Sequence, residues 1–428
     1  MVNSLHLGYS RKMRASFSNR PLRFVFAANL ISMVGSGMNS AAVAWYILKA
    51  THSEMALGTF AVLQTVPAML MLPFTGVVID REDRRKLVMW LDAIRAVIIV
   101  AVAILAFREQ VKVWQLYLMN TLVAAGFWMF WPTITALIQE LTPEGQFVQS
   151  NTFLLAGVQG GFLIAGAIVG FIYDHIGLGG VLILDVSTYV VSFLCYLAVR
   201  KGRHIVVKPQ ELKADLAAAE TQLTRFWREM KEGLQFLRDH RAVVLLGASW
   251  ALFLGAMITG VVVTPSLSDR VFHAGAKGYG WLNAGWGTGA FVSALYSPQI
   301  IAWIGGRRAI AFSMALLSVC VAFAPISGFL FLAITTYFVM GSARGVGGVA
   351  MNTSLMEMVP QHLMGRVQNA FYFAGTSLQL LLAIVVGTVA QKVSLVVAFA
   401  ILGCVYALSF VASSVPVKDQ VRQEMAAD

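Results

Sequence analysis

The stretch GVVIDREDRRK, residues 76–86, places charged side chains at six consecutive positions, Asp80 to Arg85. The chain around it has 428 residues, of which 58% are hydrophobic and only 12% are charged. Its mean hydropathy is +0.72, and apolar runs long enough to cross a bilayer lie on both sides of the charged stretch. The charges therefore mark a short polar turn between two membrane-spanning helices.

A spanning helix needs about 20 mostly apolar residues, and the sequence predicts twelve such helices. The first six spans are expected at 23–48, 56–79, 87–107, 113–138, 147–172 and 180–199. The second six are expected at 242–267, 279–302, 308–324, 328–350, 367–390 and 394–415. We predict an all-α membrane protein with two pseudo-symmetric six-helix bundles, 1–199 and 242–428, the second ending in a short cytoplasmic tail. Residues 200–241 are expected to form a cytoplasmic linker.

The linker contains apolar side chains at helical spacing with basic residues between them, a pattern typical of an amphipathic helix. Such a helix either lies on the inner membrane surface or packs as a solvated helix against the bundle. The sequence leaves both interpretations open.

The net charge of +11 would suit a nucleic-acid partner if the basic residues were clustered on one domain. Most of the 32 Lys and Arg residues instead lie in loops on one side of the predicted membrane. This asymmetry predicts that both termini are cytoplasmic and that no nucleic acid is bound. We expect a monomeric, multi-pass protein of a bacterial-type inner membrane, with the first span as an uncleaved anchor.

The sequence has no pattern of an enzyme or a metal site. Its cysteines, Cys195, Cys320 and Cys404, are far apart in apolar spans and suit neither a disulfide framework nor a metal site. There is no nucleotide-binding Gly-Lys-Ser/Thr loop, Gly-x-Ser-x-Gly elbow or His-Glu-x-x-His helix. We therefore expect no enzymatic activity, no cofactor and no metal, and an energy supply from an ion gradient or from the substrate's own gradient.

An internal repeat relates the two halves. QELTPEGQFVQS at 139–150 aligns with MEMVPQHLMGRVQN at 356–369, so that Glu140 corresponds to Glu357. Duplicated halves are typical of transporters that bind a substrate between the halves near the membrane midplane and rock about it.

On this map, GVVIDREDRRK resembles the signature loop of the major facilitator superfamily, with Asp83 where many members have Gly. Four longer stretches resemble the branch of macrolide efflux proteins and the enterobactin exporter. They are ANLISMVGSGMNSAAVAWYIL (28–48), DREDRRKLVMWLDAIRA (80–96), FWREMKEGLQFLRDHR (226–241) and MVPQHLMGRVQNAF (358–371). The resemblance implies a proton-driven exporter of amphipathic compounds. In this branch an acid often follows the Gly of the first span, whereas here Gly35 is followed by Ser36.

Charged residues at the cytoplasmic ends of the spans predict a gate, because such contacts can hold that side closed in one state and release it in another. A second pair of arginines stands in the corresponding loop of the second half. The gating candidates are Gly76, Asp80, Arg81, Arg84, Arg85, Arg307, Arg308, Glu140 and Glu357.

Ionisable residues inside the spans are costly, at least about 2.5–3.5 kcal/mol each, and are therefore candidates for proton coupling. Asp92 and Arg95 lie three residues apart and can pair on one helical face, either to hold the gate or to carry protons. Asp185 has no local partner in the sequence and is the best single candidate for proton handling, the alternative being a packing role with hydrogen bonds.

Polar and aromatic residues in the spans predict the substrate cavity, with interhelical hydrogen bonding or packing as the alternative role. Arg344 is expected either to attract an anionic part of the substrate or to pair with an acid across the halves. The cavity candidates are Asn29, Ser32, Ser36 and Asn39 in the first span, Trp128, Trp131 and Trp250, Arg344, and Asn369, Tyr372 and Thr376 in the eleventh span.

Three functions remain in view. The leading one is export of amphipathic small molecules, of drug or siderophore type, by proton antiport with alternating access. The alternatives are an importer or facilitator of a small nutrient and a membrane scaffold or receptor that transports nothing. The fold serves both directions of transport, so the sequence separates them poorly.

Overall fold

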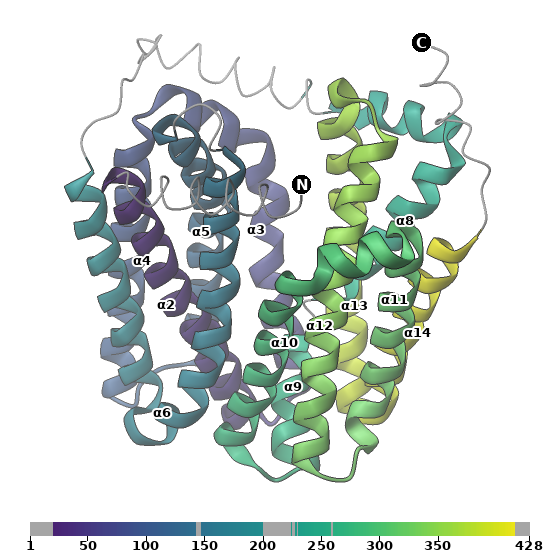
Figure 1. The fold of residues 1–428 in the computed structure, drawn as a ribbon. Helices are drawn as coiled ribbons and strands as arrows, with labels where there is room; N and C mark the ends of the chain where they lie inside the picture. The colour runs from purple at the N-terminus through teal and green to yellow at the C-terminus, as the bar shows by residue number, and fades with distance from the viewer. Residues whose placement is uncertain are drawn as a thin grey trace. The chain divides into compact units, whose positions relative to one another are not determined.

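The computed structural model describes residues 20–142, 147–199, 224, 227–228, 230–257 and 260–415, and within these ranges every regular element is helical (Figure 1). The first half contributes α2 (Arg20–Thr51), α3 (Glu54–Arg81), α4 (Arg84–Phe107), α5 (Val113–Leu141) and α6 (Phe147–Ala198). The second half contributes α8 (Arg241–Met257), α9 (Gly260–Ser266), the π-helical turn η1 (Leu267–Val271), α10 (Gly275–Ile304), α11 (Gly306–Phe323), the 3₁₀ turn η2 (Ala324–Ile326), α12 (Leu330–Met358), α13 (Gln361–Lys392) and α14 (Leu395–Ser414). The all-α fold predicted from the sequence is confirmed.

Each predicted span overlaps a described helix. Two spans fall on α6, which is interrupted at Gly177, where φ is 62° and ψ is −172°. Another span is shared by α8 and α9. In the described part of the chain, nine segments are long and apolar enough to cross a membrane. The exact number of twelve stays a prediction.

The internal repeat is visible in the helix boundaries. Helices α5 and α12 each have 29 residues, and α12 begins and ends 217 residues after α5, at 330 against 113 and at 358 against 141. Both helices end on an extended residue, Thr142 with ψ 124° and Val359 with ψ 127°. The repeat in sequence is therefore a repeat in backbone structure.

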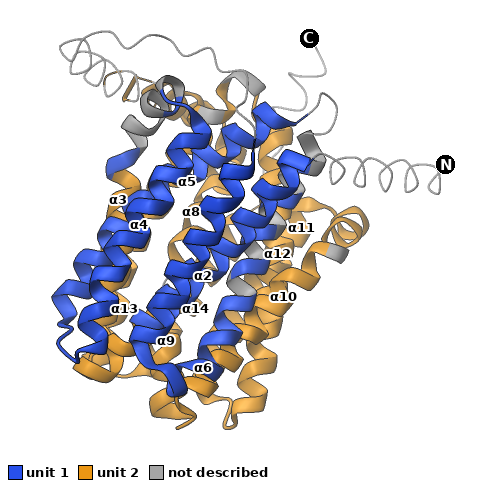
Figure 2. Ribbon diagram, turned by 90° about the vertical axis from the view of Figure 1, so that its left-hand side faces the viewer, with its two compact units in different colours: residues 1–43, 70–219 blue, residues 44–69, 220–428 orange. Residues whose placement is uncertain are grey.

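The contacts divide the chain into two compact units, coloured separately in Figure 2. One unit contains residues 1–43 and 70–219, and the other contains residues 44–69 and 220–428. The end of α2 and the beginning of α3 thus pack with the helices of the second half. Apart from residues 44–69, the division of the chain into two bundles at the linker 200–241 stays a prediction.

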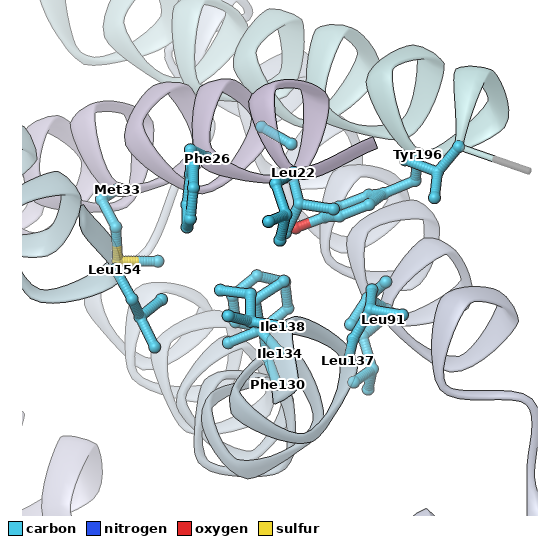
Figure 3. Packing of buried hydrophobic residues seen from close by; sticks show 14 residues of the cluster. Leu22, Phe26, Met33, Leu91, Phe130, Ile134, Leu137, Ile138, Leu154 and Tyr196 are labelled. Carbon is cyan, nitrogen blue, oxygen red and sulfur yellow. The ribbon is translucent and has the colours of Figure 1, made fainter. Parts of the chain in front are cut away.

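The first unit has an apolar core that is built from four helices (Figure 3). In α5, the buried residues Phe130, Ile134, Leu137 and Ile138 follow the spacing i, i+4, i+7, i+8 and so occupy one face. They meet side chains of α2, α4 and α6, among them Leu22, Phe26, Met33, Leu91, Leu154 and Tyr196. Because lipid tails are as apolar as these side chains, van der Waals packing holds the helices together.

In the second unit, α10 packs on α12, α11 on α12 and α14, and α8 on α13 and α14. The segment 44–69 joins α13 by close backbone contact. A Cβ on Gly58 would lie 2.6 Å from the carbonyl oxygen of Ala383, and one on Gly387 would lie 2.9 Å from that of Glu54. Small residues therefore let α3 and α13 approach closely.

Residues 230–239 of the linker are helical. Met230 and Leu237 are buried, and Glu232 lies 2.7 Å from Arg366 at the start of α13. Leu234 is exposed. One face of this helix thus packs against the bundle, as one of the two interpretations of the linker expects, while the other face carries an exposed apolar side chain.

Candidate functional site

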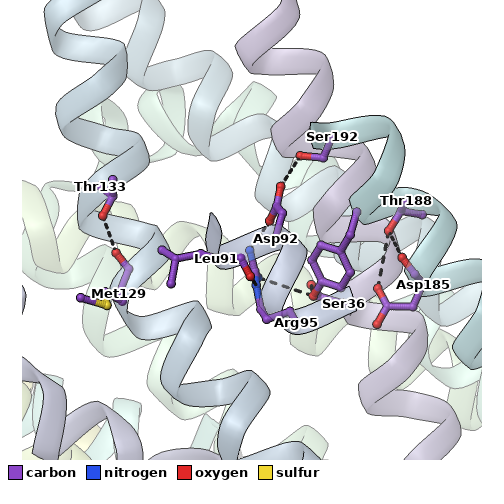
Figure 4. Close-up of polar contacts among 10 residues, drawn as sticks. Ser36, Leu91, Asp92, Arg95, Met129, Thr133, Asp185, Thr188 and Ser192 are labelled. Atoms are coloured by element: carbon purple, nitrogen blue, oxygen red, sulfur yellow. Dashed lines mark hydrogen bonds and ion pairs between the residues drawn. The ribbon is translucent and has the colours of Figure 1, made fainter. Parts of the chain in front are cut away.

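Three ionisable side chains of the first unit lie together in its interior. Asp92 and Arg95 are one turn apart on α4, and Asp185 is in the second part of α6 (Figure 4). Each has at most 1% of its surface exposed. Asp92 and Arg95 form the expected ion pair, and Ser192 donates a hydrogen bond of 2.7 Å to the other oxygen of Asp92.

Asp185 receives hydrogen bonds from neutral groups. The amide of Asn39 in α2 donates to one carboxylate oxygen at 2.7 Å, and the hydroxyl of Thr188 lies 3.5 Å from the other oxygen. Gly35, one helical turn before Asn39, leaves the room for these side chains, because a Cβ there would overlap both Thr188 and Asp185. Gly35 thus borders the pocket of Asp185, although the residue that follows Gly35 is Ser36 and not the acid that is frequent in this branch.

Arg95 links Asp92 to Tyr189, which lies one helical turn after Asp185 on α6. Its guanidinium lies 4.6 Å from the Tyr189 ring centroid and 4.8 Å from the Phe130 ring centroid, within range of cation–π attraction. One of its nitrogens is 3.5 Å from the Tyr189 hydroxyl, which is 2.9 Å from the hydroxyl of Ser36. The cluster therefore joins α2, α4, α5 and α6 in one polar network.

The polar stripe of α2 faces this network and the neighbouring part of α6. Ser36 and Asn39 bind Tyr189 and Asp185, as described, and Asn29 donates to the carbonyl of Leu154 at 3.3 Å. Ser32 is fully buried. The structure thus gives Asn29, Ser36 and Asn39 partners within the first unit, whereas the buried hydroxyl of Ser32 has no hydrogen-bond partner among the described residues.

The signature loop between α3 and α4 binds the ends of two other helices. Arg85 donates to the carbonyls of Tyr196 and Leu197 at the end of α6, at 2.7 and 2.9 Å. Arg84 donates to the carbonyl of Ala136 and lies 3.6 Å from the carboxylate of Glu140 at the end of α5. The structure therefore brings two gating candidates, Arg84 and Glu140, together. Gly76, Asp80 and Arg81 lie on α3, but their side-chain environment is outside what the structure describes.

The second half repeats part of this arrangement. Arg307, the second residue of α11, donates to the carbonyl of Ser413 at the end of α14, as Arg85, the second residue of α4, does at the end of α6. Arg308 and Glu357 are exposed, and within the described ranges neither forms an ion pair. The repeat thus conserves the helix-end contact and lacks the Arg–Glu contact.

The sequence analysis missed a cluster of charges at the other end of the second unit. Glu54, which is fully buried, lies 2.9 Å from Arg270 of η1, and Lys49 lies 2.6 Å from Asp269. Gln391 of α13 accepts a hydrogen bond of 2.8 Å from the backbone N–H of Glu54. These residues were overlooked because they lie at helix ends and in the short turn η1, where they form no motif. The signal that could have found them is the opposite charge of Lys49 and Asp269 and of Glu54 and Arg270.

The remaining cavity candidates are spread over both units. Trp131 packs against the apolar core of the first unit, and Trp128 meets Phe127 edge to face. On α13, Thr376 is buried and Asn369 is exposed. Trp250 on α8 and Tyr372 on α13 are half-buried.

Arg344 lies in α12, half-buried, beside Trp286 and Met257. Within the described residues, no group of three or more metal-ligating side chains gathers.

Several helices of membrane-spanning length with ionisable residues buried inside them are typical of a multi-pass membrane protein. The sequence profile of the Major Facilitator Superfamily matches residues 25–381, and the chain belongs to this family.

Relatives within this family are distant. Macrolide efflux protein A of Streptococcus pyogenes is 23% identical over 259 residues, which cover 60% of this chain and 61% of the relative, less than two-thirds of its length. BacE of Bacillus subtilis (strain 168), named for a proposed role as bacilysin exporter, is 25% identical over 74% of this chain and 75% of its own. A crystal structure of a variant of the nucleoside transporter NupG superposes with a TM-score of 0.72 over 92% of this chain and 100% of NupG, at 14% identity, and so shares the fold.

Proposed function

We propose that this transporter exports amphipathic small molecules in exchange for protons, by alternating access. The observation that carries the proposal is the buried cluster of Asp92, Arg95 and Asp185 in the first unit. An ionisable residue at membrane depth is expensive and marks a functional site by default.

The charge balance of the cluster leaves room for one proton. Asp92 is neutralised by Arg95, with which it forms an ion pair. The hydrogen bonds of Asp185 come from the neutral groups Asn39 and Thr188. With both acids ionised, the enclosed cluster carries one net negative charge, which is costly in a low-dielectric interior. A proton on Asp185 removes that charge, so Asp185 is the proposed proton carrier.

The hydrogen bonds of the cluster give the proton a mechanical effect. Asp185 and Tyr189 of α6 hold Asn39 and Ser36 of α2. A protonated carboxyl has an O–H donor, no negative charge and less acceptor capacity than the carboxylate, so its contact with Asn39 changes when the proton binds. Proton binding and release therefore bias the packing of α2 against α6, which is the kind of two-state element that transport requires.

Alternating access also needs a barrier on each side of the membrane. The loop at Arg84 and Arg85, at the ends of α5 and α6, is the proposed cytoplasmic barrier. The ion pairs of Lys49 and Glu54 with η1 are the proposed outer barrier. With the positive loops inside, both termini are cytoplasmic in this arrangement, and we propose a monomer in a bacterial-type inner membrane.

The names of the relatives favour export over import. Macrolide efflux protein A is named for efflux and BacE for export. Their identities of 23% and 25% do not extend to substrate choice, so the proposal commits to amphipathic compounds as a class.

The test uses energised inside-out vesicles that contain the full-length protein, with a fluorescent reporter of the pH gradient. The compounds added are lipophilic cations, macrolides, catecholate siderophores and peptide-like carboxylates. We expect at least one compound to release protons in a protein-dependent manner. Asp185→Asn, which is permanently neutral, is expected to abolish proton release while retaining counterflow exchange of the same compound.

The matched control is Asp174→Asn, the same change at an exposed position of α6. It should leave both proton release and counterflow unaltered. Export by antiport would be refuted if the wild type carries a compound without moving protons. That outcome would instead favour the facilitator.

A further inference from the structure

Arg344 is the only charged residue in the interior of the second-half spans. In the sequence, no other Asp, Glu, Lys or Arg occurs between residues 309 and 356, or in the stretches 242–268, 278–306 and 367–391. A cation at this depth normally has an acidic partner or a functional reason to be there.

The described surroundings of Arg344 supply no acidic side chain, although the Tyr406 hydroxyl of α14 interacts electrostatically with its guanidinium. Its Nε lies 3.1 Å from the sulfur of Met257 in α8, and its guanidinium lies 4.8 Å from the ring centroid of Trp286 in α10. Among the described residues, no carboxylate lies within ion-pair distance, and no further hydrogen bond of the guanidinium is formed. Since a guanidinium carries five N–H donors, most of its donor capacity is left for a guest.

The face of α12 that carries Arg344 also has open space. Gly348 is one turn further along, and a Cβ built there would meet no atom within 4 Å. Gly341, by contrast, lies directly against the backbone of Trp286, where a Cβ would overlap its carbonyl. Helix packing therefore explains Gly341 but leaves Gly348 without a structural reason.

A second polar group continues the same face. Asn352 lies two turns beyond Arg344, about 12 Å along the helix, and its Oδ1 is buried without a hydrogen-bond donor among the described residues. A buried acceptor without a donor costs free energy that a ligand can recover. Arg344, Gly348 and Asn352 thus follow one face of α12, with a cation at one end and an acceptor at the other, and we name this stretch of the face the slot.

We propose that this slot binds an amphipathic oxyanion, with the carboxylate of the substrate on Arg344, an aromatic or apolar body along Trp286 and Met257, and a hydrogen-bond donor on Asn352. Guanidinium groups match carboxylates in a planar, two-bonded geometry. The proposal rests on the proposed function, because it names the substrate class of the exporter.

The test measures binding to the purified full-length protein in nanodiscs of zwitterionic phosphatidylcholine, by calorimetry and without a proton gradient. The probes share one ring system: 1-naphthaleneacetate, the neutral 1-naphthaleneacetamide and the cationic 1-naphthylmethylamine. We expect the acetate to bind most tightly. Arg344→Gln should weaken the acetate at least about tenfold and leave the acetamide unchanged, because the lost contact is to a charge.

Two further variants keep the test decisive. Lys277→Gln removes the same charge from an exposed site of α10 and should change nothing. Gly348→Leu should retain the wild-type melting temperature, since the position is open, and should weaken the acetate and the acetamide alike by filling the slot.

Several results would overturn the inference: acetate and acetamide binding equally well, equal losses for both in Arg344→Gln, or no effect of Gly348→Leu. A fall in acetate affinity when phosphatidylglycerol is added to the nanodiscs would assign the site to a lipid headgroup and would also overturn it. Because the assay needs no gradient, these failures are separate from a failure of proton antiport. If the slot binds no oxyanion, a cationic compound could still release protons from the vesicles, and proton antiport would then stand without this inference.

Discussion

The two halves of the molecule share a backbone and differ in the charges inside it. In the first unit, two acids and one cation lie in a closed network in which Asp92, Arg95 and Asp185 all have partners. In the second unit, Arg344 lies beside a thioether, an indole and the phenol of Tyr406, and it forms no ion pair with a described residue. The same backbone arrangement thus holds paired charges in the first half and a cation without an acidic partner among the described residues in the second half. The first arrangement suits an ion that is handled within the protein, and the second suits a guest from outside.

Removal of each cation is the strongest way to break this comparison. Arg95→Met is expected to lower the free energy of unfolding by about 3–5 kcal/mol, because it leaves Asp92 buried without its counter-charge. Arg344→Met is expected to cost less than about 1 kcal/mol, because no described acid loses a partner. Unfolding in mixed detergent micelles measures both.

The control for Arg95 is the double variant Arg95→Met with Asp92→Leu, which removes both charges and should recover most of the loss. Equal destabilisation by the two single variants would show that Arg344 is as firmly paired as Arg95, and would contradict the contrast between the units.

The glycines of α12 sharpen the comparison within the second unit. Gly341→Ala is expected to destabilise the protein by about 1–3 kcal/mol, because the new methyl group meets the backbone of Trp286. Gly348→Ala is expected to change stability by less than about 0.5 kcal/mol. Melting temperatures of the two purified variants separate these outcomes, and a large loss in Gly348→Ala would show that the space beside it is filled.

The outer ion pairs offer a smaller contrast between a buried and an exposed partner. Arg270→Gln should cost about 1–3 kcal/mol, because the fully buried Glu54 loses its cation. Asp269→Asn should cost at most about 1 kcal/mol, because Lys49 is half-exposed and salt screens the pair. The free energy of unfolding is measured for both variants at low and at high salt. If the loss in Arg270→Gln depends more on salt than the loss in Asp269→Asn, the pair of Glu54 and Arg270 is the more solvent-exposed one, which would contradict the structure.

The last comparison concerns the arginines at the helix ends of the two halves. Arg85→Gln removes two hydrogen bonds to carbonyls of α6, and Arg307→Gln removes one to α14. Each bond contributes about 0.5–1.5 kcal/mol, so Arg85→Gln should be the more damaging variant. Hydrogen exchange in the last turns of α6 and α14 reports each contact separately. If Arg307→Gln accelerates exchange in α14 more than Arg85→Gln accelerates it in α6, the order expected from the number of hydrogen bonds is wrong.

Much of the fold was predictable because the bilayer restricts the backbone to helices of known length. The repeat at Glu140 and Glu357 also located equivalent helix ends, which the boundaries of α5 and α12 bear out. The pair of Asp92 and Arg95 followed from helical spacing alone. Each of these inferences uses residues that are near one another in sequence or equivalent by duplication.

Contacts between distant residues were beyond reach. Asp185 binds Asn39, 146 residues away, and nothing in the spacing of either helix names the other as its neighbour. Periodicity placed Ser36 and Asn39 on one face of α2 but could not say whether that face meets a cavity or α6. For the same reason, the sequence did not predict that residues 44–69 belong to the second unit, because this assignment depends on contacts with η1 and α13.

The position of residues 44–69 has a consequence for how the protein is made. Glu54 is among the first membrane residues to leave the ribosome, whereas its partner Gln391 follows 337 residues later. At about 5–20 residues per second, the hairpin of α2 and α3 waits about 17–70 s before that partner is synthesised. During this interval the backbone N–H of Glu54 lacks the acceptor that it has in the finished fold. The packing of the start of α3 is therefore completed only when α13 has been translated. A chain that stops before α13 lacks the contacts that Glu54 and Gly58 make with that helix.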